Sequence, residues 1–472
     1  MNLPEPLLQS LKAVKGFDEE AFKKVHQAGE QVTSVRLNPG KISNVEYAMF
    51  NVQEDPERSR RAPFTTHEEK VPWCANGFYL QERPSFTADP LFHAGAYYVQ
   101  EASSMFLEQT LQQTTDLSQP IRVLDLCAAP GGKSTLIQSL ICAESLLVSN
   151  EVIKTRVNIL SENITKWGAA NVIVTNNDPK DFQRLENYFD VIVVDAPCSG
   201  SGLFRKDAAA IEEWSINNVQ LCSQRQQRIL ADVMPALKEN GTLIYSTCSY
   251  SEAEDEAIGD WAVQTLGMES VQLKIEDSWG IVETISSKEK TFGYRFYPDK
   301  VKGEGFFIAA FKKLAGSGYV KQEKKEKKIT GKVTKAEIEM LQPWLTNAAD
   351  FFFIKQNDEI IAMPIHLQDD LDYIQASLYI KKAGVRMGTV IRNELIPHHE
   401  LAISTVANAA IPYCEADLET ALQYLRKQDV KIETTIKGWA LIKYMQLSLG
   451  WVKILPNRIN NYYPKEWRIL NK

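Results

Sequence analysis

The stretch IRVLDLCAAPGGKSTLIQSL, from Ile121 to Leu140, decides the fold of this chain. It opens with an apolar run, passes through small residues and two glycines, and continues with Leu136, Ile137 and Leu140 at helical spacing. Further apolar runs alternate with helical patterns as far as a helix expected from about Glu252. This alternation is typical of a parallel sheet covered by helices on both faces. We therefore predict an α/β, doubly wound domain.

Five segments read as strands buried on both faces, since they are nearly unbroken runs of Val, Ile and Leu. They are IRVLDLC (121–127), SLLVSNE (145–151), NVIVTNND (171–178), FDVIVVDAP (189–197) and GTLIYSTCS (241–249). Helices are expected at 132–143, 152–168 and 219–241, with Gly168 and Gly241 ending the last two. Open parallel sheets bind ligands beyond the carboxyl ends of their strands, so functional residues are expected at that edge.

Every one of these strands ends in residues with distinctive chemistry. Asp125 leads into a loop whose small residues let the backbone approach a ligand just before a helix N-terminus. An acid at Glu151 suits the two hydroxyls of a ribose, and Asp178 is placed to meet an adenine edge. The loop and the acids together predict a nucleoside-type cofactor site. Its expected residues are Cys127, Ala128, Ala129, Pro130, Gly131, Gly132, Lys133, Glu151, Asp178 and Asp195.

Two cysteines end the last two strands: Cys198 after Asp195, in DAPCSGSG, and Cys248 in YSTCSYSE. A lone cysteine at a strand end is usually a packing residue. That interpretation is applied to the four cysteines outside these motifs and the loop, which are Cys74, Cys142, Cys222 and Cys414. Two thiols at neighbouring strand ends instead indicate chemistry.

The acids also have simpler structural interpretations. Asp125 can cap the next helix, and Glu151 can interact with a helix dipole. Asp178 can be an ordinary turn residue before Pro179. Four acids in register, with two thiols beside them, favour the ligand interpretation.

The segment GGKST imitates a phosphate-binding P-loop, and VIVVDAP imitates the strand and acid that hold magnesium. The P-loop spacing requires glycine at position 127, where Cys127 stands. A P-loop NTPase is therefore the second hypothesis. A third is a non-catalytic RNA-binding factor that has kept the fold.

Composition limits the classes of protein to which this chain can belong. The chain has 472 residues, a net charge of −7 and seven scattered cysteines without a C-x-x-C pair, so neither a disulfide framework nor a zinc site is expected. No leading signal segment and no run of roughly 20 apolar residues is present, so we expect no membrane association. Free thiols indicate the reducing cytoplasm. No metal ligand cluster is evident.

The chain divides into four expected parts. Residues 1–110 mix helical and strand patterns; 111–313 hold the parallel sheet; 314–332 form a Lys-rich linker; 333–472 form an extension. From Lys431 to Lys472, eight Lys and Arg face two Glu, a net of +6. Aromatic residues are interleaved with them, a composition suited to phosphates and stacked bases, although these aromatics equally suit the core of a small β domain. They are Trp439, Tyr444, Trp451, Tyr462, Tyr463 and Trp467.

Three motifs, DLCAAPGGKST, DAPCSGSGLFRKD and YSTCSYSEAEDE, resemble the RNA cytosine-C5 methyltransferases of the Sun/nucleolar-protein family in order and spacing. The flanks YYVQEASSM and GEGFFIAAFKK are also similar, though YPDKVKGEGFF departs from the family's basic residue before the glycines. The layout is most like bacterial members acting on 16S ribosomal RNA. The resemblance implies a Rossmann-like sheet that binds S-adenosylmethionine, an N-terminal α+β RNA-binding domain and a C-terminal PUA-like β domain.

The resemblance also implies the chemistry. Carbon 5 of cytosine is a poor nucleophile, and addition of a thiolate to carbon 6 places electron density on it. Cys248 is then the nucleophile, Cys198 assists release of the methylated RNA, and Asp195 engages the base. Spacing alone leaves the two cysteine roles open to exchange. Lys206 is a candidate for orienting the target nucleotide, or a solvated surface residue. The expected partner is ribosomal RNA or a small-subunit particle, with no obligate protein partner.

Overall fold

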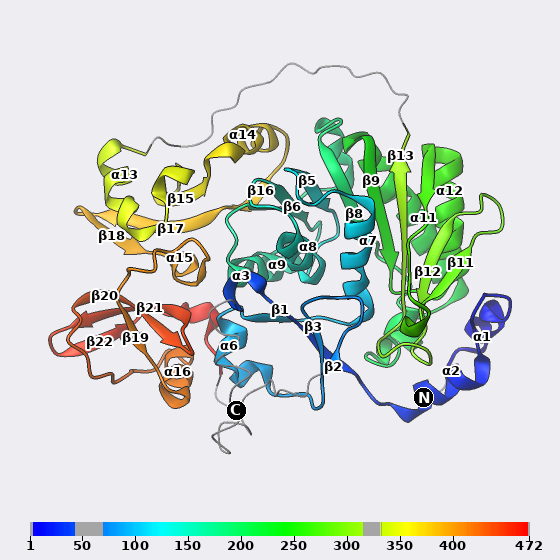
Figure 1. Ribbon diagram of the computed structural model, residues 1–472, viewed down its shortest axis with the longest axis horizontal. Coiled ribbons are helices and arrows are strands. Elements are labelled where there is room, and N and C mark those ends of the chain that lie inside the picture. The colour runs from blue at the N-terminus through cyan, green and yellow to red at the C-terminus, as the bar shows by residue number, and fades with distance from the viewer. Residues whose placement is uncertain (1–2, 43–68, 315–330, 332, 471–472) are drawn as a thin grey trace.

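The computed structural model describes residues 3–42, 69–314, 331 and 333–470. At its centre lies a ten-stranded sheet in the order β11-β12-β13-β9-β8-β5-β6-β7-β16, with β10 pairing with β13 (Figure 1). Five of its strands are parallel, as predicted: β5 (Arg122–Asp125), β6 (Leu146–Asn150), β7 (Val172–Thr175), β8 (Phe189–Asp195) and β9 (Leu237–Thr247). The doubly wound α/β prediction is confirmed.

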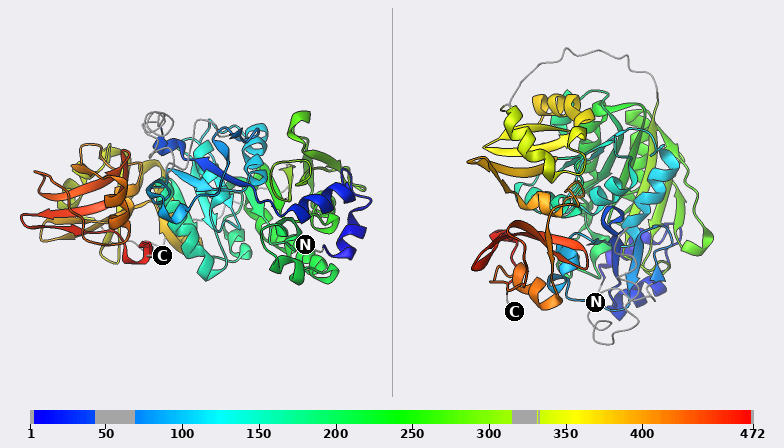
Figure 2. Two further views of the ribbon diagram at one scale, coloured as in Figure 1. Left: turned by 90° about the horizontal axis from the view of Figure 1, so that it is seen from below. Right: turned by 60° about the vertical axis from the view of Figure 1, so that its left-hand side comes forward.

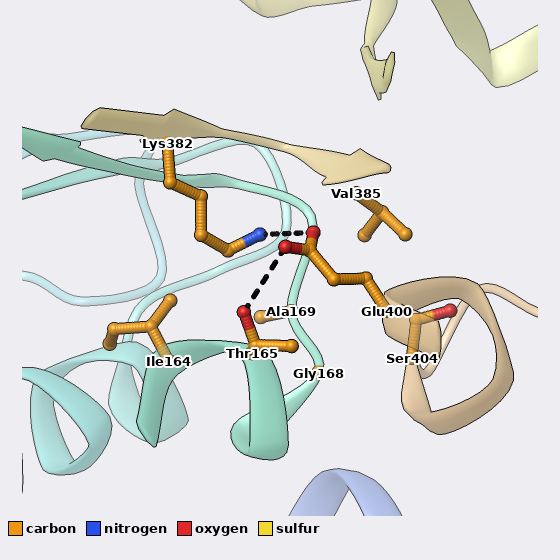
Figure 3. Close-up of a pocket in the computed structure, with 8 residues that line it drawn as sticks. All are labelled: Ile164, Thr165, Gly168, Ala169, Lys382, Val385, Glu400 and Ser404. Carbon is orange, nitrogen blue, oxygen red and sulfur yellow. Dashed lines mark hydrogen bonds and ion pairs between the residues drawn. The ribbon is translucent and has the colours of Figure 1, made fainter. Parts of the chain in front are cut away.

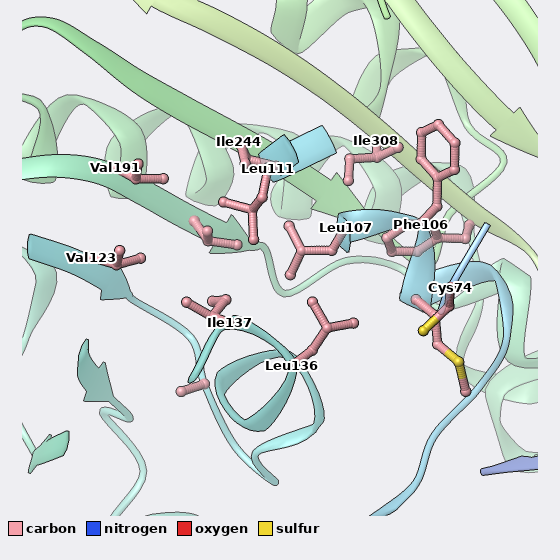
Figure 4. Close-up of a cluster of buried hydrophobic side chains, with 14 of the residues drawn as sticks. Cys74, Phe106, Leu107, Leu111, Val123, Leu136, Ile137, Val191, Ile244 and Ile308 are labelled. Atoms are coloured by element: carbon pink, nitrogen blue, oxygen red, sulfur yellow. The ribbon is translucent and has the colours of Figure 1, made fainter. Parts of the chain in front are cut away.

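Alternation of side chains along the strands builds one core on each face of the sheet. On the first face Val123, Val191 and Ile244 meet helices α7 (Leu107–Thr114) and α8 (Gly132–Leu140), as Figure 4 shows, and α9 (Lys154–Trp167) packs into the same core. On the second face the intervening residues, such as Leu124 and Ile192, meet α11 (Ile216–Val233), α12 (Glu256–Leu266) and α14 (Gln368–Ser377). Helices therefore cover both faces and leave the strand ends free to build a site.

The boundary between the helix expected at 219–241 and the strand that follows it is wrong. The helix expected to run to Gly241 ends at Val233, and β9 begins at Leu237. Pro235 lies in a 3-10 turn that separates them, and Leu237 pairs with Phe189 of β8, so the sheet takes residues that look helical. The helix expected from Glu252 begins at Glu256, after a 3-10 turn.

The remaining strands of the central sheet are antiparallel to their neighbours. They are β10 (Met268–Val271), β11 (Val282–Ile285), β12 (Phe292–Phe296), β13 (Phe306–Lys313) and β16 (Ile380–Ala383). Strand β16 belongs to the expected extension 333–472 and pairs with β7, so this extension is not a separate unit throughout. The expected linker 314–332 lies outside the described residues, apart from its ends at Leu314 and Gly331.

The N-terminal part is α+β, as expected, with an antiparallel sheet in the order β2-β3-β1-β4. Its strands are β1 (Thr33–Leu37), β2 (Glu69–Lys70), β3 (Gly77–Leu80) and β4 (Tyr97–Val99). Its helices are α1 (Glu5–Leu11), α2 (Glu19–Ala28), α3 (Pro39–Ile42) and α6 (Pro90–His93). Arg36 of β1 is buried and donates to Thr135 and the Gly132 carbonyl of α8, which ties this part to the central domain.

The C-terminal part contains two further four-stranded sheets (Figure 2). The first comprises β14 (Phe351–Gln356), β15 (Glu359–Pro364), β17 (Val385–Ile391) and β18 (Glu394–Pro397), and the second β19 (Tyr413–Glu415), β20 (Gly438–Tyr444), β21 (Leu447–Leu455) and β22 (Arg458–Asn461). Helices here are α13 (Lys335–Leu341), α15 (His399–Ile403) and α16 (Leu418–Leu425). Of the tail aromatics, Trp451 and Tyr463 are buried core residues, whereas Trp439 and Tyr462 remain partly exposed.

A buried ion pair within the C-terminal part also contacts α9, through Thr165. Lys382 of β16 donates to Glu400 of α15 at 2.7 Å, and Thr165 of α9 approaches the same carboxylate, in the pocket that Figure 3 shows. Burial opposes the charge on Glu400, but Lys382 and His398 favour it and lower the pKa of Glu400 to about 2. The pocket lies at the amino end of β7, the opposite edge of the sheet from Cys198 and Cys248.

We expect Glu400→Gln to lower the free energy of unfolding by about 3 kcal/mol at pH 7, because it leaves the Lys382 cation buried without a counter-charge. The carboxylate contributes stability above its unfolded pKa, near 4.5, and this contribution is lost as the pH falls towards 2. The difference in unfolding free energy between the wild type and Glu400→Gln should therefore shrink below pH 4.5. Urea melts at pH 7 and pH 3 measure it, with the exposed Glu419→Gln as the control. An equal difference at both pH values would contradict this account.

Candidate active site

Two cysteine sulfurs meet at the carboxyl edge of the central sheet. Strands β8 and β9 are adjacent and parallel, so the loops that follow them leave the sheet side by side. The Sγ atoms of Cys198 and Cys248 lie 3.0 Å apart, and both side chains are only partly buried. The expectation that the two strand ends bring the thiols together is therefore met by the geometry.

Close backbone contacts hold the Cys248 loop in place. The Gly202 amide donates to the Cys248 carbonyl at 2.8 Å, and the Gly305 amide donates to the Gly202 carbonyl at 3.2 Å. A Cβ atom at Gly202 would lie 2.5 Å from the Gly305 oxygen and 2.8 Å from the Cys248 oxygen, so only glycine fits there. The nucleophile candidate is thus set on rigid backbone and not on a mobile loop.

Asp195 lies beside the thiols and forms an ion pair with Lys133. Its Oδ2 lies 2.8 Å from the Lys133 Nζ, while its Oδ1 accepts from the Ser246 hydroxyl at 2.8 Å. Burial opposes the charge on Lys133, but Asp195 outweighs it and raises the pKa of this lysine. Lys133 also lies over the Phe306 ring at 5.1 Å, so it remains a fixed cation at the thiol edge.

The environment of Cys198 keeps its thiol protonated. Its hydrogen bond with Cys248, its burial and the negative charge of Glu254 all raise the pKa of Cys198 well above the ordinary value. A neutral thiol 3.0 Å from a second sulfur can donate to a thiolate there. The pair is arranged so that one sulfur can carry charge while the other holds a proton.

The predicted cofactor loop occupies the end of β5. Asp125 is fully buried, and burial raises its pKa to about 7. It accepts from Ser134 through Oδ2, while Oδ1 has no hydrogen-bond partner among the described residues. Gly131, at a φ of +117°, is the N-cap of α8, so Asp125 is not the cap of that helix. Arg156 and Asn163 of α9 bind the carbonyls of Ala129 and Pro130, and Cys127 contributes a half-buried side chain whose pKa burial raises.

The next two strands place the remaining predicted acids along the same edge. Glu151 is 3% exposed, and its Oε1 accepts from the Ile153 amide at 2.9 Å. Asp178 is exposed and caps the 3-10 turn that begins at Pro179, accepting from the Lys180 amide. Asp178 therefore has the contacts of an ordinary turn residue. It also lies at the carboxyl edge of the sheet, beside the other predicted acids.

These residues fit a cofactor of the nucleoside type. An unpartnered buried carboxylate oxygen on Asp125 points to a missing donor, and a carboxylate at Glu151 suits ribose hydroxyls. Among residues 3–42, 69–314 and 333–470, no cluster of three His, Cys, Asp or Glu side chains has a metal-binding arrangement. Nor does any helix in these ranges combine the length and apolarity needed to cross a membrane.

Two features of the site were not predicted from the sequence. The ion pair between Lys133 and Asp195 links the loop after β5 to the loop after β8, and Glu254 binds the residues that follow both cysteines. Lys206, the candidate for orienting a nucleotide, is exposed, whereas its neighbour Arg205 is buried and forms an ion pair with Glu304 at 3.7 Å.

Three family profiles match successive parts of the chain. They are described as the N-terminal domain of 16S rRNA methyltransferase RsmF, over residues 3–102, 16S rRNA methyltransferase RsmB/F, over 112–312, and the methyltransferase RsmF PUA domain, over 413–469. A ribosomal RNA small subunit methyltransferase F from Aeromonas salmonicida is 31% identical over 450 residues, which cover 92% of this chain and 90% of that one. The chain belongs to the RsmB/F family of 16S rRNA methyltransferases.

Other RsmB/F relatives and solved structures agree. A ribosomal RNA small subunit methyltransferase F from Shewanella oneidensis is 30% identical over 444 residues, again covering 92% and 90% of the two chains. The structure of a methyltransferase homolog protein from Pyrococcus horikoshii is 28% identical, with a TM-score of 0.52, and covers 66% of this chain and all of that one. NSun6 from Pyrococcus horikoshii with SFG, at 18% identity and a TM-score of 0.53, shares the fold over 66% of this chain and 99% of its own.

RsmB/F membership settles the class of protein. The chain is a methyltransferase with a Rossmann-like sheet and a C-terminal PUA domain, and its cofactor is S-adenosylmethionine. The P-loop NTPase and the non-catalytic RNA-binding factor are thereby set aside. The Sun/nucleolar-protein resemblance read from the motifs is confirmed at the level of the RsmB/F family.

Proposed function

We propose that this RsmB/F enzyme methylates carbon 5 of a cytosine in 16S ribosomal RNA through a transient bond between the Cys248 sulfur and carbon 6. The observation that carries the proposal is the pair of thiols 3.0 Å apart at the ligand edge of the sheet. A reaction that both makes and breaks a bond to sulfur needs a nucleophile and a proton carrier in contact. Few other reactions of a methyltransferase need two thiols together.

Cys248 is the better candidate for the nucleophile. The raised pKa of Cys198, caused by its bond to Cys248, its burial and Glu254, keeps that thiol protonated, and a protonated thiol is the poorer nucleophile. Thiolate is intrinsically nucleophilic, and its addition to carbon 6 moves electron density to carbon 5. When bound, S-adenosylmethionine supplies an electrophilic methyl group.

Asp195 and Lys133 then stabilise the base. A carboxylate at Asp195 can accept from the exocyclic amine of cytosine or bind a proton at its ring nitrogen, which offsets charge that develops on addition. Lys133 holds that carboxylate in place at 2.8 Å. Once Cys248 is bonded to carbon 6, its hydrogen bond no longer raises the pKa of Cys198, so the Cys198 thiol can lose its proton to water. After the methyl group has reached carbon 5, the Cys198 thiolate, directly or through a water, removes the proton from that carbon. The carbon–sulfur bond breaks, and Cys248 leaves as a thiolate.

The cofactor is proposed to lie along the ends of β5, β6 and β7. The loop from Cys127 to Lys133 holds it by backbone contacts and a helix N-terminus, and Glu151 binds its ribose hydroxyls. Asp178 would accept from its adenine amine, and Asp195 would engage the base beside it. The Oδ1 of Asp125 supports this arrangement, since Asp125 leads into the same loop and this buried oxygen has no hydrogen-bond partner in the described part of the chain.

The RNA is proposed to be bound by the flanking domains. The target base must leave its stack, at a cost of a few kcal/mol in a duplex and less in a loop. With a net charge of −7, the whole chain does not attract RNA by charge alone, so residues 1–110 and the basic tail of 333–472 supply phosphate contacts around the 111–313 domain. The enzyme is expected to act in the cytoplasm, where ribosomal RNA is used.

Product analysis tests this proposal. The purified enzyme is incubated with methyl-labelled S-adenosylmethionine and 16S ribosomal RNA, either naked or in small subunits, and the RNA is digested to nucleosides. We expect the label in 5-methylcytidine and in no other nucleoside. Label in another nucleoside, or on a ribose hydroxyl, would overturn the cytosine assignment and with it the need for a covalent thiol.

A further inference from the structure

A single buried carboxylate joins the two cysteine loops. Glu254 has no exposed surface and lies in the 3-10 turn Glu252–Glu254 that follows Cys248. Its Oε1 accepts from the Ser199 amide at 2.8 Å, and its Oε2 accepts from the Ser199 hydroxyl at 2.5 Å and from the Ser249 hydroxyl at 2.7 Å. Ser199 directly follows Cys198 and Ser249 directly follows Cys248, so one side chain binds both neighbours of the thiols.

Gln226 completes the arrangement from the side of helix α11. Its amide nitrogen donates to Glu254 Oε1 at 3.2 Å and to the Pro197 carbonyl at 3.1 Å. Pro197 directly precedes Cys198, so this loop is held on both sides of its cysteine. Four donors therefore converge on one carboxylate, and this number matches what its two oxygens can accept.

The burial of Glu254 is costly and needs a reason. No lysine, arginine or histidine in the described part of the chain forms an ion pair with it, and burial raises the pKa of Glu254 against the opposing effect of its hydrogen bonds. A carboxylate buried without a cation is rare in proteins. An apolar residue would fill the same space at lower cost, but it could not bind two loops at once.

We infer that Glu254 is a positioning residue that sets the contact between the Cys198 and Cys248 sulfurs and thereby controls the release of methylated RNA. This inference rests on the proposed function. Glu254 does not touch either sulfur, and it acts through Ser199 and Ser249. Attack by Cys248 on the base needs only that one loop is in place. Release needs both loops in register, because Cys198 must reach the proton on carbon 5 while Cys248 is still bound to carbon 6.

Release of the methylated RNA therefore depends on Glu254, whereas attack on carbon 6 depends on Cys248 alone. Glu254→Gln has nearly the same shape but replaces one acceptor oxygen with a donor group, which faces the donors from Ser199, Ser249 and Gln226. We expect the two loops to separate slightly, with a larger effect on release than on attack. A displacement of about 1 Å in such a site can cost about 100-fold in rate.

The experiment compares covalent adduct and turnover in the full-length enzyme with 16S ribosomal RNA and S-adenosylmethionine. For Glu254→Gln we expect turnover to fall about 10-fold or more while the denaturation-resistant enzyme–RNA adduct rises at least about 5-fold above wild type. Ser199→Ala, which removes only one bond to the carboxylate, should change both quantities in the same direction to a smaller extent. It also keeps the inference testable if Glu254→Gln folds poorly.

Ser223→Ala is the matched control. The Ser223 hydroxyl donates to the Ala253 carbonyl at 2.8 Å, so its loss also weakens the anchoring of this turn to α11, but it touches neither cysteine loop. We expect no rise in adduct for this variant. If Glu254→Gln loses turnover with no rise in adduct, or Ser223→Ala shows the same rise, Glu254 is only a structural residue and the inference is wrong.

Failure of the proposed function is seen separately in Cys198→Ala. If this variant forms no adduct that depends on Cys248, the proposed division of roles between the two cysteines is wrong, whatever Glu254→Gln does. If Cys198→Ala accumulates adduct and Glu254→Gln does not, the covalent mechanism is supported and only the role inferred for Glu254 is wrong.

Discussion

Cys248→Ala is expected to abolish methyl transfer, with a loss of about 1,000-fold or more in single-turnover rate. Without a sulfur at this position nothing adds to carbon 6, and carbon 5 keeps too little electron density to accept a methyl group. The neighbouring Cys198 cannot take over easily, because its burial and the charge of Glu254 still raise its pKa when Cys248 is gone. The rate is measured with labelled S-adenosylmethionine and excess enzyme, and S-adenosylmethionine binding is checked by calorimetry.

Cys222→Ala is the control for this prediction. Cys222 is 4% exposed on α11 and belongs to the cysteines interpreted as packing residues. Its variant should retain near wild-type activity apart from a modest loss of stability. Full activity in Cys248→Ala, with adduct formed at Cys198 instead, would mean that the two cysteines have exchanged roles.

Cys198→Ala is expected to trap the enzyme on its substrate. Cys248 should still attack, since its loop is held by Gly202 and Glu254 and not by the Cys198 side chain. The proton on carbon 5 then has no acceptor in place, so the carbon–sulfur bond persists. A denaturing gel with labelled RNA should show a retarded band that contains most of the active enzyme, against a faint band or none for wild type.

The double variant Cys198→Ala/Cys248→Ala shows whether the trapped bond is the expected one. It should give no retarded band at all. A band that survives in the double variant would place the adduct on another residue. Rapid turnover by Cys198→Ala without any adduct would remove Cys198 from the release step.

The parallel sheet and its ligand edge could be predicted from the sequence because each strand is a buried apolar run with a chemically distinct end. Asp125, Asp195 and Cys248 could be located in this way from local sequence alone. Strand β9 was misjudged because Leu237 begins a strand in a segment of helical composition, and its pairing with Phe189 is a tertiary contact. The proline at 235 was the available signal.

Glu254 was missed for a different reason. The run EAEDE reads as the solvated start of a helix, yet Glu254 and Asp255 have no exposed surface. Arg295, 40 residues further on, lies 3.1 Å from Asp255, and Ser199 reaches Glu254 from the preceding strand end. Because these partners are distant in sequence, they leave no local pattern. The burial of Glu254 and Asp255 therefore cannot be predicted from the sequence around them.

Strand β16 has a consequence for how the chain folds during its synthesis. Until residues 380–383 have left the ribosome, β7 is the last strand of its sheet and presents free amides and carbonyls at a strongly apolar edge. Such an edge invites pairing with another nascent copy. The parallel core can therefore finish folding only when about four-fifths of the polypeptide has been synthesised, which makes the late-emerging extension a guard against misassembly.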